Sequence, residues 1–465
     1  MPPDADGPVR VRVFQALVPC ILACTITVLS AIVELGYEYS PMCILIGGLW
    51  SAVALVRADR WSLFSPLPYF LLTCSLYFGV GALLPVLGSR VDAEYVTAFY
   101  PLSDENRARI ALLNSLSIIG VLVGFLAASS IIARKDSLSL PKPSVRELWI
   151  WAYTFLAVGW AARLSASHMA GVGNVIFSLE NFVVISLLLF AYLSSYRRQK
   201  LDYCLTGLVL VLEIVWSIGH LSKHGAALAL VFTISGLSFW RRRPYLVFVG
   251  GFLVTFVFVF SLTPFIGLAR DYQRISEERG VNLDWWEFGQ QAFLKGELET
   301  PSALTRFCYS TGQAYCMDQF DAGVPGETYK LIPISIIPRM VWQQKPVITV
   351  GYSFNESVTG NPDSASAPGI FAELYWNGGW TLTLVTTLCL GVYFFIGHDL
   401  IFWIFTKGKY AWLPLMLNFV IQAVRPDDWF VSTFVSSLPV AVIQCLLCLG
   451  LQSLIAITAG SRING

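Results

Sequence analysis

Charged residues are scarce in this sequence. Lys and Arg number 31 and Asp and Glu number 30, together 13% of the 465 residues, against about 25% in ordinary soluble domains. Hydrophobic residues make up 55%, and the mean hydropathy is +0.63. A chain with so little charge cannot face water on all sides, so the composition predicts a polytopic membrane protein. The net charge of +1 excludes nucleic acid as a partner, and 14% aromatic residues exclude a disordered chain.

Several catalytic motifs are also missing. There is no Walker motif, no G-x-S-x-G and no H-E-x-x-H, and the one D-x-D pattern, Asp4–Asp6, lies in the N-terminal tail. We therefore expect no cofactor and no metal, and neither ATP-driven transport nor serine or zinc proteolysis. Most of the ten cysteines lie in apolar runs and are typical of buried residues. Only Cys308 and Cys316 lie in a polar region, where they could pair in an oxidising compartment.

Twelve apolar segments are predicted to be membrane helices, since a bilayer core needs about 20 apolar residues per helix. They cover residues 14–34, 41–56, 66–87, 110–133, 147–162, 175–195, 202–220, 224–240, 245–265, 379–397, 411–424 and 429–459. Their connections alternate in basic content: one set holds 17 Lys and Arg, whereas the short connections of the opposite set hold 6. By the positive-inside rule, both termini are predicted to be cytoplasmic.

The ninth and tenth segments are joined by one long connection, 266–378, which falls on the outer side. It is rich in aromatic residues and is not disordered in composition. Segments 267–279 and 284–296 each have one apolar face and are predicted to lie along the membrane surface. The polar, turn-rich segment 353–368 is predicted to be a mobile loop.

The expected fold is therefore an all-α polytopic membrane protein with about 12 transmembrane helices and one large outer loop containing short surface helices. Transmembrane helices 1–9 occupy residues 1–265, the extracytoplasmic loop region occupies 266–378, and helices 10–12 occupy 379–465.

Basic side chains gather on the outer side, where short connections normally lack them. We single out Arg163, Lys223, Arg270, Arg339 and Arg425. Guanidinium forks bind phosphate oxygens bidentately and a Lys ammonium adds a point charge, so this set suits a membrane-anchored phosphate or diphosphate. For any one of them taken alone, snorkelling toward lipid headgroups is the favoured interpretation. For Lys223 and Arg425, which lie in turns of few residues, the two interpretations are balanced.

Glu373 is the first candidate for a general base. It precedes the tenth helix on a short helix-like segment that enters the membrane, where partial desolvation suits a carboxyl to proton transfer. An ion pair with an Arg of the loop is the alternative. His224 is the second candidate, although a lone His at the start of a helix is more often structural. Further carboxylates on this face are Asp271, Glu327, Asp427 and Asp428.

Glu213 indicates a different chemistry. It lies in the middle of an apolar segment, and an intramembrane carboxylate is costly and often functional. It is therefore the best single feature of a proton-coupled transporter. A pair with another helix inside the protein is an equal alternative.

Three stretches together resemble the Wzy-type O-antigen or repeat-unit polysaccharide polymerases of bacteria. LSKHGAALALV resembles the family's short outer turn with a basic residue before Gly, although the family often has Arg where this chain has Lys223 and His224. LIPISIIPRMVWQQKP (331–346) resembles a P-R-x-x-W…K-P stretch, and PGIFAELYWNGGW (368–380) resembles a Gly-x-x-x-Glu-x-Tyr-x-x-x-Gly helix entrance. The matching residues of the last two are Pro338, Arg339, Trp342, Lys345, Pro346, Gly369, Glu373, Tyr375 and Gly379.

The resemblance implies a lipid-dependent glycosyltransferase of the GT-C type in the bacterial inner membrane. Its partners would be an undecaprenyl-diphosphate-linked glycan donor, a lipid-linked acceptor, membrane lipids and a chain-length regulator. In these roles Lys223, Arg270, Arg339 and Arg425 would hold the diphosphate, and Glu373 would deprotonate the acceptor hydroxyl, with His224 as second choice. A lipid-linked oligosaccharide flippase or other secondary transporter, an O-antigen-ligase-like glycan transferase and a non-catalytic assembly protein remain alternatives.

Overall fold

The computed structural model describes residues 9–87, 97, 100–131, 143–166, 179–279, 305, 307–337, 342, 344–346, 349–360, 362 and 365–461. All regular secondary structure in these ranges is helical, which confirms the all-α prediction. The helices, in chain order, are α1 (Val9–Ile32), α2 (Ser40–Ala58), α3 (Pro66–Cys74), α4 (Gly81–Leu87), α6 (Asp104–Ile131), α7 (Val145–Ala166), α9 (Phe182–Arg197), α10 (Lys200–Gly219), α11 (Lys223–Phe239), α12 (Pro244–Arg279), α14 (Ser310–Asp321), α15 (Ile332–Ile336), α16 (Val350–Thr359), α17 (Ile370–Lys407), α18 (Leu413–Ala423) and α19 (Ser436–Ser461).

A helix lies in each of the twelve predicted segments, but not all of them qualify as membrane spans by length and composition. In the described part of the chain seven do: Val11–Ile32, Tyr37–Ala58, Pro66–Pro85, Asp104–Ile131, Lys200–Gly219, Ile370–Lys407 and Thr433–Ser453. Four more apolar helices are shorter, namely Phe182–Arg197, Lys223–Phe239, Pro244–Phe258 and Tyr410–Ala423. α7 belongs to neither set. The seven helices are sufficient for a membrane protein, while the count of about 12 stays a prediction.

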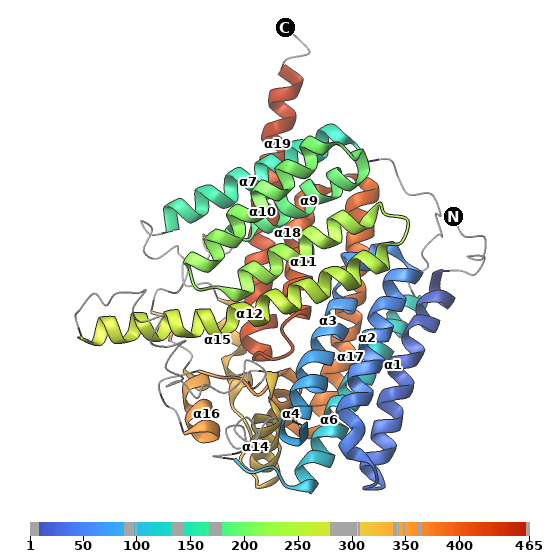
Figure 1. Ribbon diagram of the computed structural model, residues 1–465, viewed down its shortest axis with the longest axis vertical. Helices are drawn as coiled ribbons and strands as arrows, with labels where there is room; N and C mark the ends of the chain where they lie inside the picture. Colours follow the sequence, from blue (N-terminus) through green and yellow to red (C-terminus); the bar gives the residue numbers. More distant parts are fainter. Residues whose placement is uncertain are drawn as a thin grey trace.

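The helices form two groups with different directions (Figure 1). α1, α2, α3, α6 and α17 run along the long axis, whereas α7, α9, α10, α11 and α12 cross it obliquely. In the first group, α6 and α17 approach very closely: a Cβ added at Gly124 would lie 2.0 Å from the carbonyl oxygen of Leu388, and one at Gly391 would lie 2.0 Å from that of Val121. Small residues at such positions allow two membrane helices to pack backbone to backbone.

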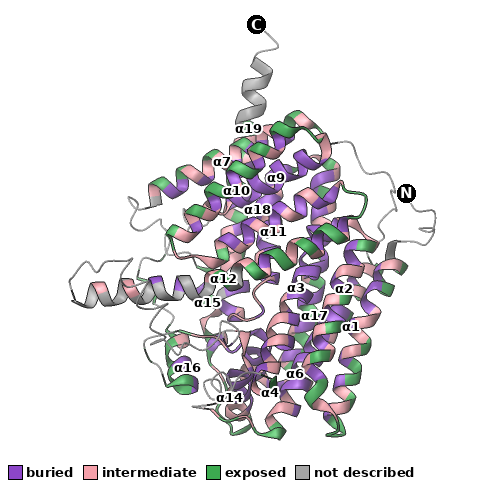
Figure 2. Ribbon diagram, viewed as in Figure 1, coloured by how far each residue is buried: buried purple, intermediate pink, exposed green. Residues whose placement is uncertain are grey.

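α9 is the most enclosed helix of the second group. Every residue from Phe182 to Ser195 is buried, because α7, α10, α11 and α18 all contact it. A helix that is apolar on all sides and this short is typical of a protein core. Figure 2 shows buried residues in the interior of both groups and at the α14 end, and exposed residues on outward-facing turns of the helices.

The long connection between α12 and α17 contributes helices of its own. Figure 1 shows α14 and α16 at one end of the first group, beside α4 and the start of α6; we call this the α14 end. The prediction of a mobile loop at 353–368 is wrong for its first half, which belongs to α16. Phe354 and Val358 lie one helical turn apart and are both buried, and this apolar pair was hidden among polar neighbours. Gly360, with φ 71°, ends the helix.

Three further expectations for this connection had different outcomes. Residues 267–279 are not a separate surface helix but continue α12, which is 36 residues long and extends beyond the bundle (Figure 1). Segment 284–296 lies outside the described residues. Cys308 and Cys316 are free thiols rather than a disulfide.

α17 contains a break that matters for the site. Gly378 and Gly379 have non-helical dihedral angles, and Gly379 has φ 59°, in the left-handed region that favours glycine. A side chain there would also meet the ring of Phe320, which lies 2.8 Å from the position of a Cβ. The break separates a first segment, Ile370–Asn377, from the rest of α17. The sequence placed the start of the tenth helix at this point and a short helix-like segment before it.

Candidate functional site

The turn between α18 and α19, Arg425–Phe430, is the centre of the candidate site. The Arg425 guanidinium forms an ion pair with Asp428 across this turn, and 43% of its side chain is exposed. Asp428 also accepts hydrogen bonds from the main-chain N–H of Trp429 and from the Thr433 hydroxyl, both at 2.8 Å. The turn therefore fixes a guanidinium with part of its surface open to a ligand.

Lys223 and His224 approach the same turn from the start of α11. The electrostatic neighbours of His224 include Arg425, Asp428 and Lys223, and the His224 side chain is exposed. Ser222 caps the helix by accepting a hydrogen bond from the N–H of Gly225 at 3.2 Å. The preceding residue, Leu221, has φ 51°, which is strained for a bulky side chain and tightens the turn.

Glu373 reaches the turn from the first segment of α17. Its carboxylate is fully buried and accepts a hydrogen bond from the main-chain N–H of Phe430 through Oε2. Oε1 makes no hydrogen bond of ordinary geometry, although the Thr328 hydroxyl is close enough to the carboxylate to interact with it. Asp428 is close enough to interact electrostatically with this carboxylate. Among the described residues no basic side chain forms an ion pair with Glu373, so the alternative of a pair with a loop Arg finds no support there.

Asp427 occupies the other side of the turn, against two tyrosines. The Tyr309 hydroxyl donates to Asp427 Oδ2 at 3.2 Å, and the Tyr77 hydroxyl lies beside the same carboxylate. Burial, reinforced by the charge of Asp428, raises the pKa of Asp427 to about 6. Burial likewise raises the pKa of Tyr309. Asp427 is thus a second carboxyl able to exchange a proton near neutral pH.

Two helical stretches next to this turn have π geometry. One is Ser75–Val80, which carries Tyr77, and the other is Val431–Val435, which follows Phe430 directly. π-helical turns are rare and occur frequently at functional sites. Their presence next to Asp427 therefore favours a functional role for this turn.

Arg163 lies in a different cluster. Its Nη1 and Nη2 donate to the two carboxylate oxygens of Glu213 at 2.6 and 2.7 Å, and both side chains are buried. The guanidinium also lies over the rings of Trp160 and Trp216, 5.1 and 5.2 Å from their centroids. Arg163 is therefore occupied by Glu213, and Glu213 has the internal partner that the sequence left open.

The remaining two candidates cannot be placed in the site. Arg270 is part of α12, but its side chain lies outside the described residues, and Arg339 lies outside them altogether. The structure therefore brings together Glu373, His224, Lys223 and Arg425, and it pairs Arg163 with Glu213.

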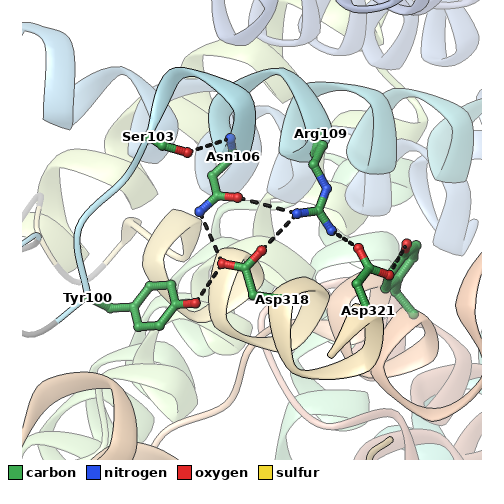
Figure 3. Close-up of polar contacts among 7 residues, drawn as sticks. Tyr100, Ser103, Asn106, Arg109, Asp318 and Asp321 are labelled. Carbon is green, nitrogen blue, oxygen red and sulfur yellow. Dashed lines mark hydrogen bonds and ion pairs between the residues drawn. The ribbon is translucent and has the colours of Figure 1, made fainter. Parts of the chain in front are cut away.

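A network of polar residues at the α14 end was missed in the sequence. Figure 3 shows Tyr100, Asn106 and Arg109 converging on Asp318 and Asp321 of α14. Arg109 Nη1 donates to Asp318 Oδ1 at 2.7 Å, and its Nη2 bonds Asp321. Since Arg109 and Asp318 are 209 residues apart, no local pattern could have linked them.

The chemistry available at the α18–α19 turn is anion binding next to proton transfer. Lys223 and Arg425 supply positive charge, while Glu373, Asp427 and His224 can accept protons. Within the described part of the chain, no group of three or more His, Cys, Asp or Glu side chains could hold a metal ion.

Comparison with known proteins does not place this chain in a family. No family model, no characterised protein and no solved structure matches it. Its function has to be argued from its own residues.

Proposed function

We propose that this chain polymerises lipid-linked oligosaccharide repeat units into a surface polysaccharide. In the reaction, a hydroxyl of the acceptor unit attacks the anomeric carbon of a glycan carried on undecaprenyl diphosphate, and undecaprenyl diphosphate leaves. One observation supports this above all: Lys223, Glu373 and Arg425 come from three distant parts of the sequence to a single turn.

The basic residues would act on the leaving group. Negative charge builds on the diphosphate as the glycosidic bond breaks, so cations aimed at it stabilise the transition state more than the ground state. Arg425 suits this role because its side chain is partly exposed while Asp428 fixes its direction. Lys223 lies on the neighbouring helix start. Arg163, which Glu213 already holds, has no part in this proposal.

Glu373 would take the proton of the attacking hydroxyl. Its Oε1 makes no hydrogen bond of ordinary geometry, so a hydroxyl of the acceptor would donate to it in place of the nearby Thr328 hydroxyl. His224, exposed beside Arg425, is the second acceptor. Tyr329 stacks on Phe430 with ring centroids 6.1 Å apart, and Phe430 holds the other carboxylate oxygen. Because Glu373 is fully buried, an acceptor reaches it only if the residues that cover it shift.

The setting of the reaction follows from the same proposal. The α14 end would face the outer side of the bacterial inner membrane, with both termini in the cytoplasm and the lipid tails between helices. A chain-length regulator would be a protein partner. The flippase alternative relied on an intramembrane carboxylate, and the pair with Arg163 gives Glu213 a structural role instead.

A reconstitution experiment tests the proposal. The purified protein in lipid vesicles receives a lipid-diphosphate-linked repeat unit and no nucleotide sugar, and the products are separated by size. We expect a ladder of longer lipid-linked glycans that is lost in Arg425→Ala and kept in Arg241→Ala, a basic residue at the opposite end of α11 that contacts Tyr203. Transfer of the intact substrate across the bilayer without a ladder would instead identify a flippase. Transfer to an added non-repeat acceptor alone would identify a ligase.

A further inference from the structure

The first segment of α17, which carries Glu373, is hydrogen-bonded to the end of α14 and to the chain that follows it. Three consecutive residues make the contacts. The Tyr375 hydroxyl donates to Asp321 Oδ1 at 3.0 Å. The Trp376 indole donates to the carbonyl oxygen of Val324 at 3.1 Å, and its own carbonyl oxygen accepts from the N–H of Gly326 at 2.8 Å.

Asn377 completes the series. Its side-chain nitrogen donates to the Thr328 hydroxyl at 2.8 Å, and its side-chain oxygen accepts from the N–H of Tyr329 at 3.3 Å. The next two residues, Gly378 and Gly379, leave the helical conformation. Because glycine restricts the backbone least, the membrane-spanning part of α17 does not by itself fix the position of the first segment. The contacts of Tyr375–Asn377 help to do so, together with the hydrogen bonds of Ile370 N–H to Pro426 and of Phe430 N–H to Glu373.

These contacts are in turn tied to the bundle through Arg109, beside a second link in which Asn114 of α6 and Gln313 of α14 form two hydrogen bonds. Arg109 of α6 bonds Asp318 and Asp321 together, and the same Asp321 accepts from Tyr375 (Figure 3). Tyr100 and Asn106 donate to the second oxygen of Asp318 at 2.6 and 3.1 Å. An arginine that bridges two carboxylates in a network holds geometry far better than an isolated surface pair.

We propose that Arg109 is a positioning residue for the Glu373 carboxylate, acting through Asp321 and Tyr375. This inference rests on the proposed function, because it assigns a purpose to the location of Glu373. The chain of contacts runs from α6 through the last turn of α14 to the residue two positions after Glu373. Breaking it frees the first segment to shift about Gly378–Gly379, and a displacement of about 1 Å costs on the order of 100-fold in rate.

The first arm of the test measures catalysis. In the ladder assay, Tyr375→Phe removes only one hydroxyl, and we expect the turnover number to fall roughly 10-fold with little change in KM, because substrate contacts are intact. Arg109→Gln should fall further, and Arg109→Lys should recover part of the loss. The double variant Arg109→Gln/Tyr375→Phe should be no worse than Arg109→Gln, because both changes act through Asp321. Lys330→Gln, which removes an exposed pair with Glu327 in the chain that follows α14, is the matched control.

The second arm does not depend on the reaction. Cys316 of α14 is fully buried and is an electrostatic neighbour of Glu373, so its thiol reports on the packing of this segment. Modification by a maleimide, followed by mass spectrometry of the Cys316 peptide, should be several-fold faster in Tyr375→Phe and Arg109→Gln than in the wild type and in Lys330→Gln.

The outcomes separate the two ideas. Wild-type turnover in Tyr375→Phe and Arg109→Gln, or losses that multiply in the double variant, would overturn the positioning role. Unchanged Cys316 reactivity in folded variants would overturn it as well. A wild type that forms no ladder would remove the proposed function, while faster labelling of Cys316 would still show that Arg109 and Tyr375 hold the segment.

Discussion

The main-chain N–H of Phe430 donates to the carboxylate of Glu373, 57 residues away in sequence. This bond joins the start of α17 to the turn before α19, and it places an acidic side chain beside the turn that holds Arg425. Regular secondary structure positions both residues: Glu373 lies in the first turn of a helix, and Phe430 lies directly before a π-helical stretch. The candidate site therefore lies where the start of α17 meets the α18–α19 turn, and not within one sequence motif.

The buried pair of Arg163 and Glu213 should contribute to stability rather than to diphosphate binding. Replacing Arg163 by Met leaves a buried carboxylate without its partner, and we expect a loss of about 3–5 kcal/mol in the free energy of unfolding. Arg163→Met/Glu213→Leu should recover most of it. Thermal unfolding in detergent measures both, with Arg107→Met as control, because Arg107 pairs with Asp104 at the surface and such pairs contribute at most about 1 kcal/mol. An Arg163→Met variant that keeps its stability but loses lipid-diphosphate binding would contradict this assignment.

The close approach of α6 and α17 predicts a sharp difference between two glycines. Gly124→Ala places a methyl group 2.0 Å from the Leu388 carbonyl oxygen, so the helices must separate, and we expect a loss of about 1–3 kcal/mol. Gly207→Ala on α10 meets nothing within 4 Å and should be neutral or stabilising by up to about 1 kcal/mol, since alanine favours helix. Thermal unfolding of the two variants decides the matter, and equal stabilities would show that the two helices do not pack as described.

Asp427 predicts how stability depends on pH. Its pKa is raised to about 6 in the folded protein, against about 3.9 in an unfolded chain. Between these values the folded state holds a proton that the unfolded state has released, so stability falls as the pH rises from about 4 to 6 and the loss is complete above 6. Asp427→Asn cannot ionise, so its free energy of unfolding should lack this part of the pH dependence. The stability of the variant relative to the wild type should therefore be higher at pH 7.5 than at pH 4.5, by on the order of 1 kcal/mol. Unfolding temperatures of both proteins across that range are the measurement, and parallel curves would contradict the assigned pKa.

Much of the fold could be predicted from the sequence, because the signal of an apolar helix is local. A helix lies in each segment that the hydropathy indicated, and the predicted start of the tenth helix at residue 379, with a short helix-like segment before it, coincides with the break in α17. α16 was missed because its local signal is weak: Phe354 and Val358 stand alone among polar residues. Both are buried, and Phe354 packs against Trp429, a contact that the local sequence does not show.

The sequence indicated which residues belong to the candidate site, but not that they lie close together. Charges in outer turns pointed to Lys223, Arg425 and Glu373, but their proximity depends on how α11, α17 and α18 pack. Arg163 carried the same signal and proved to belong to Glu213, because a buried ion pair and a ligand site look alike in sequence. The sequence did not indicate the role of Arg109, because its partners Asp318 and Asp321 are 209 and 212 residues away along the chain.

The most direct test of the account concerns Glu373. In a single-turnover experiment, donor and acceptor are bound to the protein in lipid vesicles, and lipid-diphosphate binding and glycosidic bond formation are measured separately. Glu373→Gln keeps the size of the side chain and an acceptor for the Phe430 N–H, so binding and unfolding temperature should stay near those of the wild type. The rate of bond formation should fall at least about 100-fold, the usual effect of removing a general base. Bond formation at the wild-type rate in a folded Glu373→Gln protein would contradict the central claim.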